Sequence, residues 1–252
     1  MLLIKWIWPF IYPNIDMDQL GGMPGCSVSH YLINMIHFIL SKLDPKKSPS
    51  SIIAAFVDFS KAFNRMSHNR LVIILSDLEI PTCALRLILS YLKNRKMCVR
   101  YKGAVSENQS IPGGGPQGSL LTVLCFILQV NDAGKPCLDE QPSSEPSVPK
   151  PCQLNDMINK KKYVDDLSML EVVKLEKLVP IEPFIGPLNY YERHGFHLPP
   201  SESILQHQLD DLLKFTQLNQ MLINKKKTFV MPFNFYKTKN FIPKINFPGD
   251  EP

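Results

Sequence analysis

The sequence predicts a fold of the α+β class, because helix and strand patterns both occur and the clearest strand pattern is a hairpin. A lysine-rich run and an apolar run flank the four residues from Tyr163 to Asp166, which is typical of two strands joined by a tight turn. Elsewhere, apolar residues recur with helical spacing. The chain has 252 residues, of which 44% are hydrophobic, so it can bury a substantial core in one or two domains.

The first half of the chain predicts helices and strands in alternation. A helical apolar stripe covers 29–43, and a short apolar run suited to a buried strand covers 51–59 and places Asp58 at its end. The further expected elements are two helices, 69–78 and 82–92, separated by Pro81, and a strand pair, 99–101 and 104–109, that turns at Lys102 and Gly103.

The second half mixes structured and proline-rich segments. A rigid loop, 112–116, leads into an apolar helix, 119–130. Prolines recur between 134 and 151 and predict a flexible surface insertion, since such a segment collapses poorly. The elements expected after the hairpin are a second proline-rich passage, 180–200, a helix, 201–222, with Ser201 as its N-cap, and a strand, 228–233.

Composition and charge restrict the class of protein without deciding it. The net charge of +5 is compatible with a polyanionic partner, and lysines cluster at 160–162 and 225–227. Six scattered cysteines without a Cys-x-x-Cys pair argue against zinc and for free thiols in a reducing compartment. The apolar N-terminus lacks the cleavage site of a signal peptide, and no apolar stretch is long enough to span a bilayer. We therefore expect an intracellular protein, nuclear or cytoplasmic, without a membrane partner.

Three acidic residues stand at the ends of predicted strands. Asp165 and Asp166 are neighbours at the hairpin turn, where carboxylates repel each other and a divalent cation that selects oxygen ligands, such as Mg²⁺, removes the conflict. Asp58 ends a strand that could lie beside this hairpin, although a turn acid or a helix N-cap explains Asp58 alone equally well. Asp-Asp pairs also occur in ordinary surface turns. If the three carboxylates converge, they suit a two-metal phosphoryl transfer, in which positioning and charge stabilisation supply most of the rate.

A glycine-rich string, Gly114–Leu121 (GGPQGSLL), lies between the two acidic motifs. Glycines let a backbone approach a bulky partner, Pro116 fixes the bend, and Gln117 offers both a donor and an acceptor at the start of a helix. An ordinary turn from loop to helix explains the glycines, but it does not explain this order of motifs along the chain.

The ordered motifs resemble the palm motifs A, B and C of reverse transcriptases, particularly those of non-LTR retroelements. These strings are FVDFSKAF at 56–63, GGPQGS at 114–119 and YVDD at 163–166. In addition, Asn224–Thr228 (NKKKT) is similar to motif D of the family, and Asp18–Gly22 (DQLGG) is similar to the Gln-x-Gly segment that precedes motif A. The resemblance covers residues 19–233. The ordered set is specific, whereas each motif alone is not.

The resemblance implies an RNA-directed DNA polymerase, a nucleotidyltransferase that adds dNTPs to a DNA primer on an RNA template. It implies a palm with an antiparallel sheet backed by helices, partial fingers and no clear thumb. Two Mg²⁺ ions, or Mn²⁺ in their place, would be held by Asp58, Asp165 and Asp166. Lys227 matches the lysine that would protonate the leaving pyrophosphate, and a solvated cation in a basic run is the equal alternative.

The resemblance also assigns contacts to the substrates. Phe63 matches the bulky residue that excludes a ribose 2′-hydroxyl, so deoxynucleotides would be preferred. The implied substrate-binding residues are Phe59, Phe63 and Gln117, and the implied template- and primer-binding residues are Gly115, Pro116, Gly118 and Tyr163. Two positions depart from the pattern: Asn64 stands where many relatives have Asp, and Thr122 replaces a glycine, so helix packing there can differ.

The resemblance divides the chain into five segments. They are partial fingers at 1–50, palm with motifs A and B at 51–133, the flexible insertion at 134–158, palm with motifs C and D at 159–235, and an unstructured or truncated tail at 236–252. Because the triphosphate-gripping fingers residues, a thumb, an endonuclease and a zinc knuckle are not recognised, we expect a fragment that is cut from a longer polyprotein or comes from a damaged element.

Two other functions remain open. A catalytically dead retroelement remnant could bind nucleic acid nonspecifically through its basic clusters; three intact acids argue against long decay. A metal-dependent nuclease or another carboxylate enzyme would also use these acids, although the glycine-rich string speaks against it. The sequence does not indicate an oligomeric state.

Overall fold

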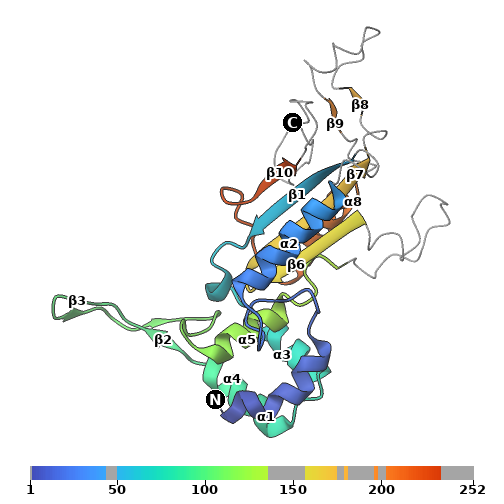
Figure 1. The fold of residues 1–252 in the computed structure, drawn as a ribbon. Helices are drawn as coiled ribbons and strands as arrows, with labels where there is room; N and C mark the ends of the chain where they lie inside the picture. The colour runs from blue at the N-terminus through green and yellow to red at the C-terminus, as the bar shows by residue number, and fades with distance from the viewer. Residues whose placement is uncertain are drawn as a thin grey trace.

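A four-stranded antiparallel sheet forms the centre of the computed structural model, which describes residues 2–43, 50–135, 157–174, 179–180, 196–197 and 203–233 (Figure 1). The strand order is β10-β1-β7-β6, and every pairing is antiparallel. The strands are β1 (Ser50–Asp58), β6 (Ile158–Tyr163), β7 (Asp166–Lys174) and β10 (Phe229–Phe233). With helices packed against this sheet, the predicted α+β class is confirmed.

Strand β1 is buried on both faces, which explains its continuous apolar run. Side chains alternate between the two faces of a strand. Ile53 and Val57 therefore join the core on one face, whereas Ile52 and Ala54 join the core on the other. A strand in this position needs apolar residues at consecutive positions, not only at every second one.

One long helix covers each face of the sheet. Helix α2 (Val28–Lys42) lies across the front face in Figure 1 and packs Phe38 and Ile39 into the smaller core. Helix α8 (Ile204–Leu218) buries Leu205 and Leu209 in the larger core. The strands that carry Asp58 and Asp166, β1 and β7, are therefore held between two helical layers.

A second group of helices lies below the sheet in Figure 1 and contributes to the larger core. Its members are α1 (Leu2–Ile11), α3 (His68–Asp77), α4 (Thr82–Leu92) and α5 (Leu120–Gln129). The sequence does not predict α1, because this segment is apolar on nearly every side and contains Pro9, so no stripe marks it as a helix.

Between α4 and α5 the chain forms a thin two-part hairpin that projects from the body (Figure 1). Strand β2 (Lys96–Met97) pairs with β5 (Gln109–Ser110), and β3 (Arg100–Tyr101) pairs with β4 (Ala104–Val105). The predicted turn at Lys102 and Gly103 is confirmed. The remaining short elements are the 3₁₀ helices η1 (Tyr12–Asn14) and η2 (Ala62–Asn64) and the paired strands β8 (Val179–Pro180) and β9 (Phe196–His197).

The predicted helices agree closely with the structure except for α8. This helix begins at Ile204, because Ser203 is the N-cap and its hydroxyl accepts a hydrogen bond from the backbone N–H of Gln206. Ser201, the predicted N-cap, lies outside the described residues. So do 136–156 of the predicted insertion and 236–252, the predicted tail.

The described cysteines are free, as expected. Cys26, Cys83 and Cys98 are exposed, and burial raises the pKa of Cys125 to about 12. Cys137 and Cys152 lie outside the described residues. Among the helices that the structure describes, none has the length and apolar character needed to cross a membrane.

The lysine run before the hairpin is paired with acids. The buried Lys162 Nζ lies 2.7 Å from Asp16 Oδ2 and donates to the Asn131 carbonyl at 2.6 Å. Lys160 pairs with Asp16 and Lys161 with Asp18. Burial alone would raise the pKa of Asp16, but the charge of Lys162 lowers it well below its usual range. Burial lowers the pKa of Lys162 to about 8, so the lysine still carries its proton at neutral pH.

This pairing corrects one interpretation of the sequence. The cluster at 160–162 is not available to a polyanion, because its ammonium groups neutralise two acids of the N-terminal segment. Its function is structural: it fixes the chain near Asp16 and Asp18 to the edge of β6. The nonspecific-binding hypothesis therefore loses one of its two basic clusters.

The buried Glu171 of β7 anchors α8 to the sheet. Its Oε2 accepts hydrogen bonds from the Ser203 hydroxyl at 2.8 Å and from the Leu205 N–H at 3.0 Å. Its Oε1 accepts from the Ile204 N–H at 3.0 Å. A carboxylate at this position satisfies free N–H groups of the first helical turn and complements the positive end of the helix dipole.

We expect Glu171→Gln to lower the free energy of unfolding by about 1–3 kcal/mol, because a neutral amide replaces a buried, charged acceptor. Chemical denaturation measures the change. The exposed Glu107 provides the control, since Glu107→Gln should change stability by less than about 0.5 kcal/mol. Equal losses in the two variants would show that Glu171 does not anchor the helix.

Candidate active site

Asp58 and the two hairpin acids meet at one end of the sheet. In the antiparallel pairing of β1 with β7, Asp58 lies directly opposite Asp166, and Asp165 precedes Asp166 in the turn. Directly opposed residues project from the same face of a sheet. The side chains of Asp58 and Asp166 therefore project from the same face of the sheet. The predicted arrangement of strand, tight turn and strand is confirmed by the pairing of β6 with β7.

The opposed carboxylates repel one another. The pKa of Asp166 is raised first by partial burial and then by the negative charges of Asp165 and Asp58. The ammonium group of Lys227 opposes this rise, so the exposed Lys227 lies close enough to Asp166 to act on its charge. Four of the residues predicted to be catalytic thus share one electrostatic environment.

The loop that carries Lys227 also holds Asp58. Asn224 Nδ2 donates to Asp58 Oδ2 at 2.8 Å, and the Asn224 N–H donates to the Asp58 carbonyl at 2.8 Å. The Asp58 N–H donates to Thr228 Oγ1 at 3.3 Å. The loop closes on itself, because the N–H groups of Lys227 and Thr228 both donate to the Asn224 carbonyl. Asn224 consequently orients the Asp58 carboxylate.

The hairpin turn is strained and rests on a glycine. Val164 has a φ of +60°, which a β-branched residue rarely adopts. Gly21 lies against this turn: a Cβ at Gly21 would stand 2.4 Å from the Val164 nitrogen and 2.7 Å from the Tyr163 carbonyl carbon. The neighbouring Leu20 donates its N–H to the Lys162 carbonyl at 2.8 Å. The Gln-x-Gly segment therefore supports the hairpin from outside the sheet.

The glycine-rich loop packs against the turn that follows β1. A Cβ at Gly114 would lie 2.7 Å from the carbonyl oxygens of Phe63 and Asn64, and the Gly115 N–H donates to the Phe63 carbonyl at 3.1 Å. On its other side, Gly115 leaves no room for a Cβ, because Thr122 Cγ2 would be 2.3 Å away. Thr122, which departs from the family's pattern, is buried and lies 3.4 Å from the Tyr91 hydroxyl.

The other predicted residues occupy different environments. Phe63 is half-buried and packs on Phe126 with ring centroids 4.9 Å apart. Gln117 is exposed and donates to Asn64 Oδ1 at 3.4 Å. Tyr163 contacts Tyr31 edge to face. Phe59 is only 4% exposed, so its side chain belongs to the core and only its backbone is left to contact a substrate.

Gly118 and Pro116 complete the surface of this loop. Gly118 has a φ of +81° and open space around it, so its backbone is accessible to a partner. Pro116 is half-buried. The loop is fixed from behind, because His68 Nε2 and Arg95 Nη1 lie 2.7 Å and 2.8 Å from the Gly114 carbonyl oxygen.

The donor chemistry of the site suits a hard divalent cation. Oxygen ligands are what Mg²⁺ selects, and the repulsion that raises the pKa of Asp166 would be relieved by a cation. Within the described part of the chain, however, no three His, Cys, Asp or Glu side chains are gathered closely enough to hold a metal ion. The carboxylates are thus neighbours at one end of the central strands, but they are not close enough together to form a complete set of metal ligands.

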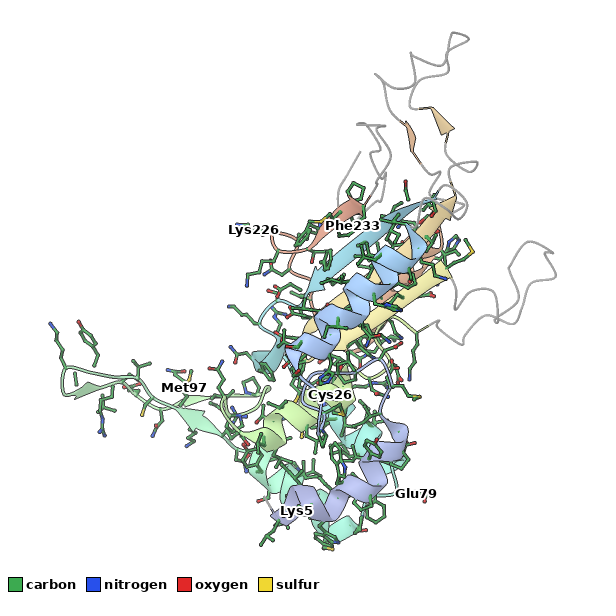
Figure 2. All side chains as sticks on the ribbon, viewed as in Figure 1. Lys5, Cys26, Glu79, Met97, Lys226 and Phe233 are labelled. Carbon is green, nitrogen blue, oxygen red and sulfur yellow. The ribbon has the colours of Figure 1, made fainter. Side chains whose placement is uncertain are left out.

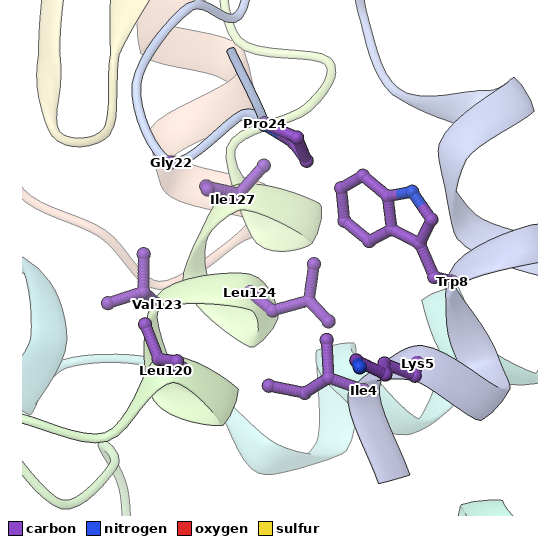
Figure 3. Close-up of a pocket in the computed structure, with 9 residues that line it drawn as sticks. All are labelled: Ile4, Lys5, Trp8, Gly22, Pro24, Leu120, Val123, Leu124 and Ile127. Carbon is purple, nitrogen blue, oxygen red and sulfur yellow. The ribbon is translucent and has the colours of Figure 1, made fainter. Parts of the chain in front are cut away.

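An apolar cavity of about 390 Å³ lies apart from these acids (Figure 3). Ile4 and Trp8 of α1 face Leu120, Leu124 and Ile127 of α5 across it. Because no carboxylate lines the cavity, it does not take part in the acidic site.

A comparison with known protein families shows to which family the chain belongs. A family model described as reverse transcriptase (RNA-dependent DNA polymerase) matches residues 1–239. The chain belongs to the reverse transcriptase family. The predicted resemblance to reverse transcriptases of non-LTR retroelements is therefore confirmed, and reverse transcriptases as a family depend on divalent metal ions.

Two curated relatives of this reverse transcriptase domain come from Drosophila melanogaster transposons. The chain is 30% identical over 118 residues to the "Probable RNA-directed DNA polymerase from transposon X-element", which covers 47% of the chain and 13% of the relative. It is 28% identical over 128 residues to the corresponding polymerase from transposon BS, covering 51% of the chain and 14% of the relative. The matches thus span about one seventh of the relatives' length.

Solved telomerase structures share the fold of this reverse transcriptase domain. The telomerase of Candida tropicalis in complex with a telomeric RNA fragment matches with a TM-score of 0.55 and 10% identity, over 90% of this chain and 32% of that one. The telomerase of Candida albicans in the corresponding complex matches with a TM-score of 0.51 and 14% identity, over 98% and 35%. At these identities the likeness concerns the fold alone.

Several supporting residues are missed by the sequence interpretation. Asn224 belongs to the recognised NKKKT string, but only the structure reveals its hydrogen bonds to Asp58. Tyr31 of α2 belongs to none of the recognised strings, yet it contacts Tyr163; burial is the main cause of its raised pKa, and the charge of Asp166 adds to it. Arg95 supports Gly114 although nothing in its local sequence signals that contact.

We expect Asp166→Asn to stabilise the metal-free protein slightly, by less than about 1 kcal/mol, because Asp166 is only partly buried and water still screens its carboxylate. The pKa of Asp166 is higher in the folded protein than in the unfolded one, so protonation of Asp166 favours folding. This stabilisation of the wild type is complete below about pH 4 and is lost as the pH rises. Thermal unfolding at pH 7 and pH 4 measures the difference. A variant that is less stable than the wild type at pH 7 without metal would contradict the repulsion.

We expect Gly21→Ala to lower the free energy of unfolding by about 1–3 kcal/mol, because its Cβ overlaps the backbone of the hairpin turn. Gly25→Ala is the control: a Cβ there meets open space, so any cost arises from its positive φ alone. Denaturation measures both variants, and primer extension reports the hairpin geometry. Loss of extension in Gly21→Ala but not in Gly25→Ala supports the contact; equal behaviour of the two variants contradicts it.

Proposed function

We propose that this chain is the palm of an RNA-directed DNA polymerase, which transfers a nucleotide from a dNTP to the 3′-hydroxyl of a DNA primer on an RNA template. The observation that carries the proposal is the pairing of Asp58 with Asp166 beside Asp165. Two motifs that are distant in the sequence thereby place carboxylates side by side at one end of the sheet. A polymerase of this class would act where its RNA is found, in the nucleus or the cytoplasm.

The reaction exchanges one phosphate ester for another. The primer 3′-oxygen forms a bond to the α-phosphorus of the dNTP, the bond from that phosphorus to the bridging oxygen breaks, and pyrophosphate leaves. The 3′-hydroxyl loses a proton and the leaving pyrophosphate gains one. Because no covalent enzyme intermediate is needed, positioning and charge stabilisation carry the catalysis.

Asp58, Asp165 and Asp166 would hold the catalytic ions, which we propose to be two Mg²⁺ ions replaceable by Mn²⁺. Such ions lower the pKa of the attacking hydroxyl and neutralise the triphosphate. The protein's own contribution is orientation. Asn224 holds the Asp58 carboxylate from one side, and the turn at Val164, supported by Gly21, presents the hairpin acids from the other.

Lys227 is suited to donate the proton that the pyrophosphate gains. Its ammonium lies within electrostatic reach of Asp166, and it is exposed toward solvent rather than held in an ion pair among the described residues. The hydrogen bond from its backbone to Asn224 links it to the loop that orients Asp58. A positioned ammonium beside the metal-binding acids is an apt general acid.

The glycine-rich loop would contact the template and the primer end. Gly118 is exposed and Pro116 is half-buried, whereas Gly115 is buried behind them, and Gln117 is exposed in the turn before α5. Phe63 lies beneath this loop, where a bulky ring would exclude a ribose 2′-hydroxyl. Tyr163 would lie beside the primer end, next to the hairpin acids.

The inactive-remnant hypothesis is not favoured. It needs acids that have lost their arrangement and basic clusters that are free for phosphates. Instead, the three acids adjoin, and the lysines at 160–162 are engaged by Asp16 and Asp18. A nuclease would leave the glycine-rich loop and its close packing against Phe63 without a role.

We expect Asp165→Asn to reduce primer extension on an RNA template by at least about a hundredfold, because a neutral amide replaces a charged carboxylate ligand at the reacting phosphate. Extension assays with a labelled primer in Mg²⁺ measure the loss. Asp132→Asn is the matched control and should retain activity, because Asp132 is an exposed acid that pairs with Lys135 away from the site. Extension by Asp165→Asn at the control rate would overturn the proposed site.

A further inference from the structure

The hairpin between α4 and α5, residues 95–111, is a second candidate interaction surface, which we name the arm. Figures 1 and 2 show that it extends away from the rest of the described chain, with Met97 labelled on it. Every residue from Lys96 to Ser110 is exposed, and Tyr101 is 70% exposed. Neither of its short strand pairs contributes a residue to a core, so packing does not explain why the arm exists.

The charge of the arm is strongly unbalanced. Its exposed cations are Lys96, Arg100 and Lys102, and its acid is Glu107. None of these side chains forms an ion pair with another residue that the structure describes. This contrasts with the lysines at 160–162, which are paired. The arm therefore keeps its positive charge available to an external partner.

The arm also presents an aromatic ring among its cations. Lys102 Nζ lies 5.6 Å from the centroid of the Tyr101 ring. Exposed cations interleaved with an exposed aromatic ring are the composition of surfaces that bind single-stranded nucleic acids, where cations contact phosphates and the ring stacks on a base.

The base of the arm is fixed to the glycine-rich loop. Arg95 Nη1 donates to the Gly114 carbonyl at 2.8 Å, and the Ile111 N–H donates to the Arg95 carbonyl at 2.9 Å. Further out, two hydrogen bonds of 2.9 Å join the two sides of the arm. The Ser106 N–H donates to the Val99 carbonyl, and the Val99 N–H donates to the Ser106 hydroxyl oxygen. A nucleic-acid strand that crosses the glycine-rich loop would therefore also contact the arm.

We propose that the arm is a separate binding site for single-stranded nucleic acid: Lys96, Arg100 and Lys102 contact phosphates, and Tyr101 stacks on a base. The site goes beyond catalysis, because it shares no residue with the acids and would bind whether or not nucleotides are added. It rests on the proposed function only in taking nucleic acid as the partner. The bound strand is either the RNA template or a single-stranded DNA.

A second copy of the chain fits this surface poorly. Pairing two arms edge to edge would bring like charges together, and lysines on short edge strands oppose such pairing. A polyanion, by contrast, is complementary to the unpaired cations. Charge complementarity therefore favours nucleic acid over self-association.

Fluorescence anisotropy with labelled 20-nucleotide RNA and DNA strands, at salt concentrations from about 50 to 200 mM, tests the proposal. All proteins carry Asp165→Asn, so binding is measured without turnover. The test variants are the double substitution Arg100→Glu with Lys102→Glu, and Tyr101→Ala. The control is Lys5→Glu, a charge reversal at another exposed lysine. Because Lys5 and the substituted residues of the arm are all exposed, these substitutions should leave thermal unfolding unchanged.

The charge-reversed arm should bind at least about tenfold more weakly, because phosphate contacts are removed. The slope of the logarithm of the binding constant against the logarithm of the salt concentration should become shallower by roughly one to two. Tyr101→Ala should bind about five- to tenfold more weakly with an unchanged slope, because stacking does not release counterions. A loss confined to the RNA probe assigns the arm to the template, and a loss confined to DNA assigns it to a DNA strand. Binding equal to that of Lys5→Glu on both probes overturns the proposal.

The two proposals can fail separately. A wild-type chain that binds through the arm but extends no primer would leave the arm in place and refute the polymerase. A chain that extends primers, but whose binding ignores the arm substitutions, would refute the arm alone.

Discussion

The constraint on which the structure depends is the alignment of β1 with β7, which places Asp58 opposite Asp166. Two carboxylates directly opposite each other on a sheet are unfavourable, and after partial burial the charges of Asp165 and Asp58 add to the raised pKa of Asp166. A sheet built for stability alone would place an opposite charge there. Packing on both faces of β1 compensates: Ile53 and Val57 fit the larger core and Ile52 and Ala54 the smaller one, and a slip of one residue would exchange these two sets. The cores on both sides of the sheet thus enforce a juxtaposition that the acids themselves resist.

Segments from elsewhere in the chain hold this arrangement at its ends. Near the hairpin, Asp16 neutralises the buried Lys162 and Gly21 lies against the strained turn at Val164. On the β1 side, Asn224 binds both the backbone and the carboxylate of Asp58. These contacts explain why the family's motifs extend beyond the acids. A metal site requires rigid neighbours, and the neighbours come from the segments before motif A and after motif C.

Much of the fold follows from the sequence, because the elements with clear periodicity or turn chemistry form where expected. Helix α4 and the turn at Lys102 are examples, and the adjacency of Asp58 to the hairpin follows from recognising ordered motifs. Helix α1 escapes prediction because its apolar residues surround it. The lysines at 160–162 resemble a phosphate-binding cluster because their acidic partners are remote in the chain. Long-range pairing of that kind has no local signature, and neither has the burial of Phe59.

The central claim is that Asp58 and the hairpin acids bind the catalytic ions together. Crystals of the chain soaked in Mn²⁺, with anomalous diffraction measured above the manganese absorption edge, test it most directly. The account predicts a manganese peak between the carboxylates of Asp58 and Asp165, absent from crystals of an Asp58→Asn variant. Manganese bound elsewhere, or no ordered ion at these acids in a chain that still extends primers, would contradict the account.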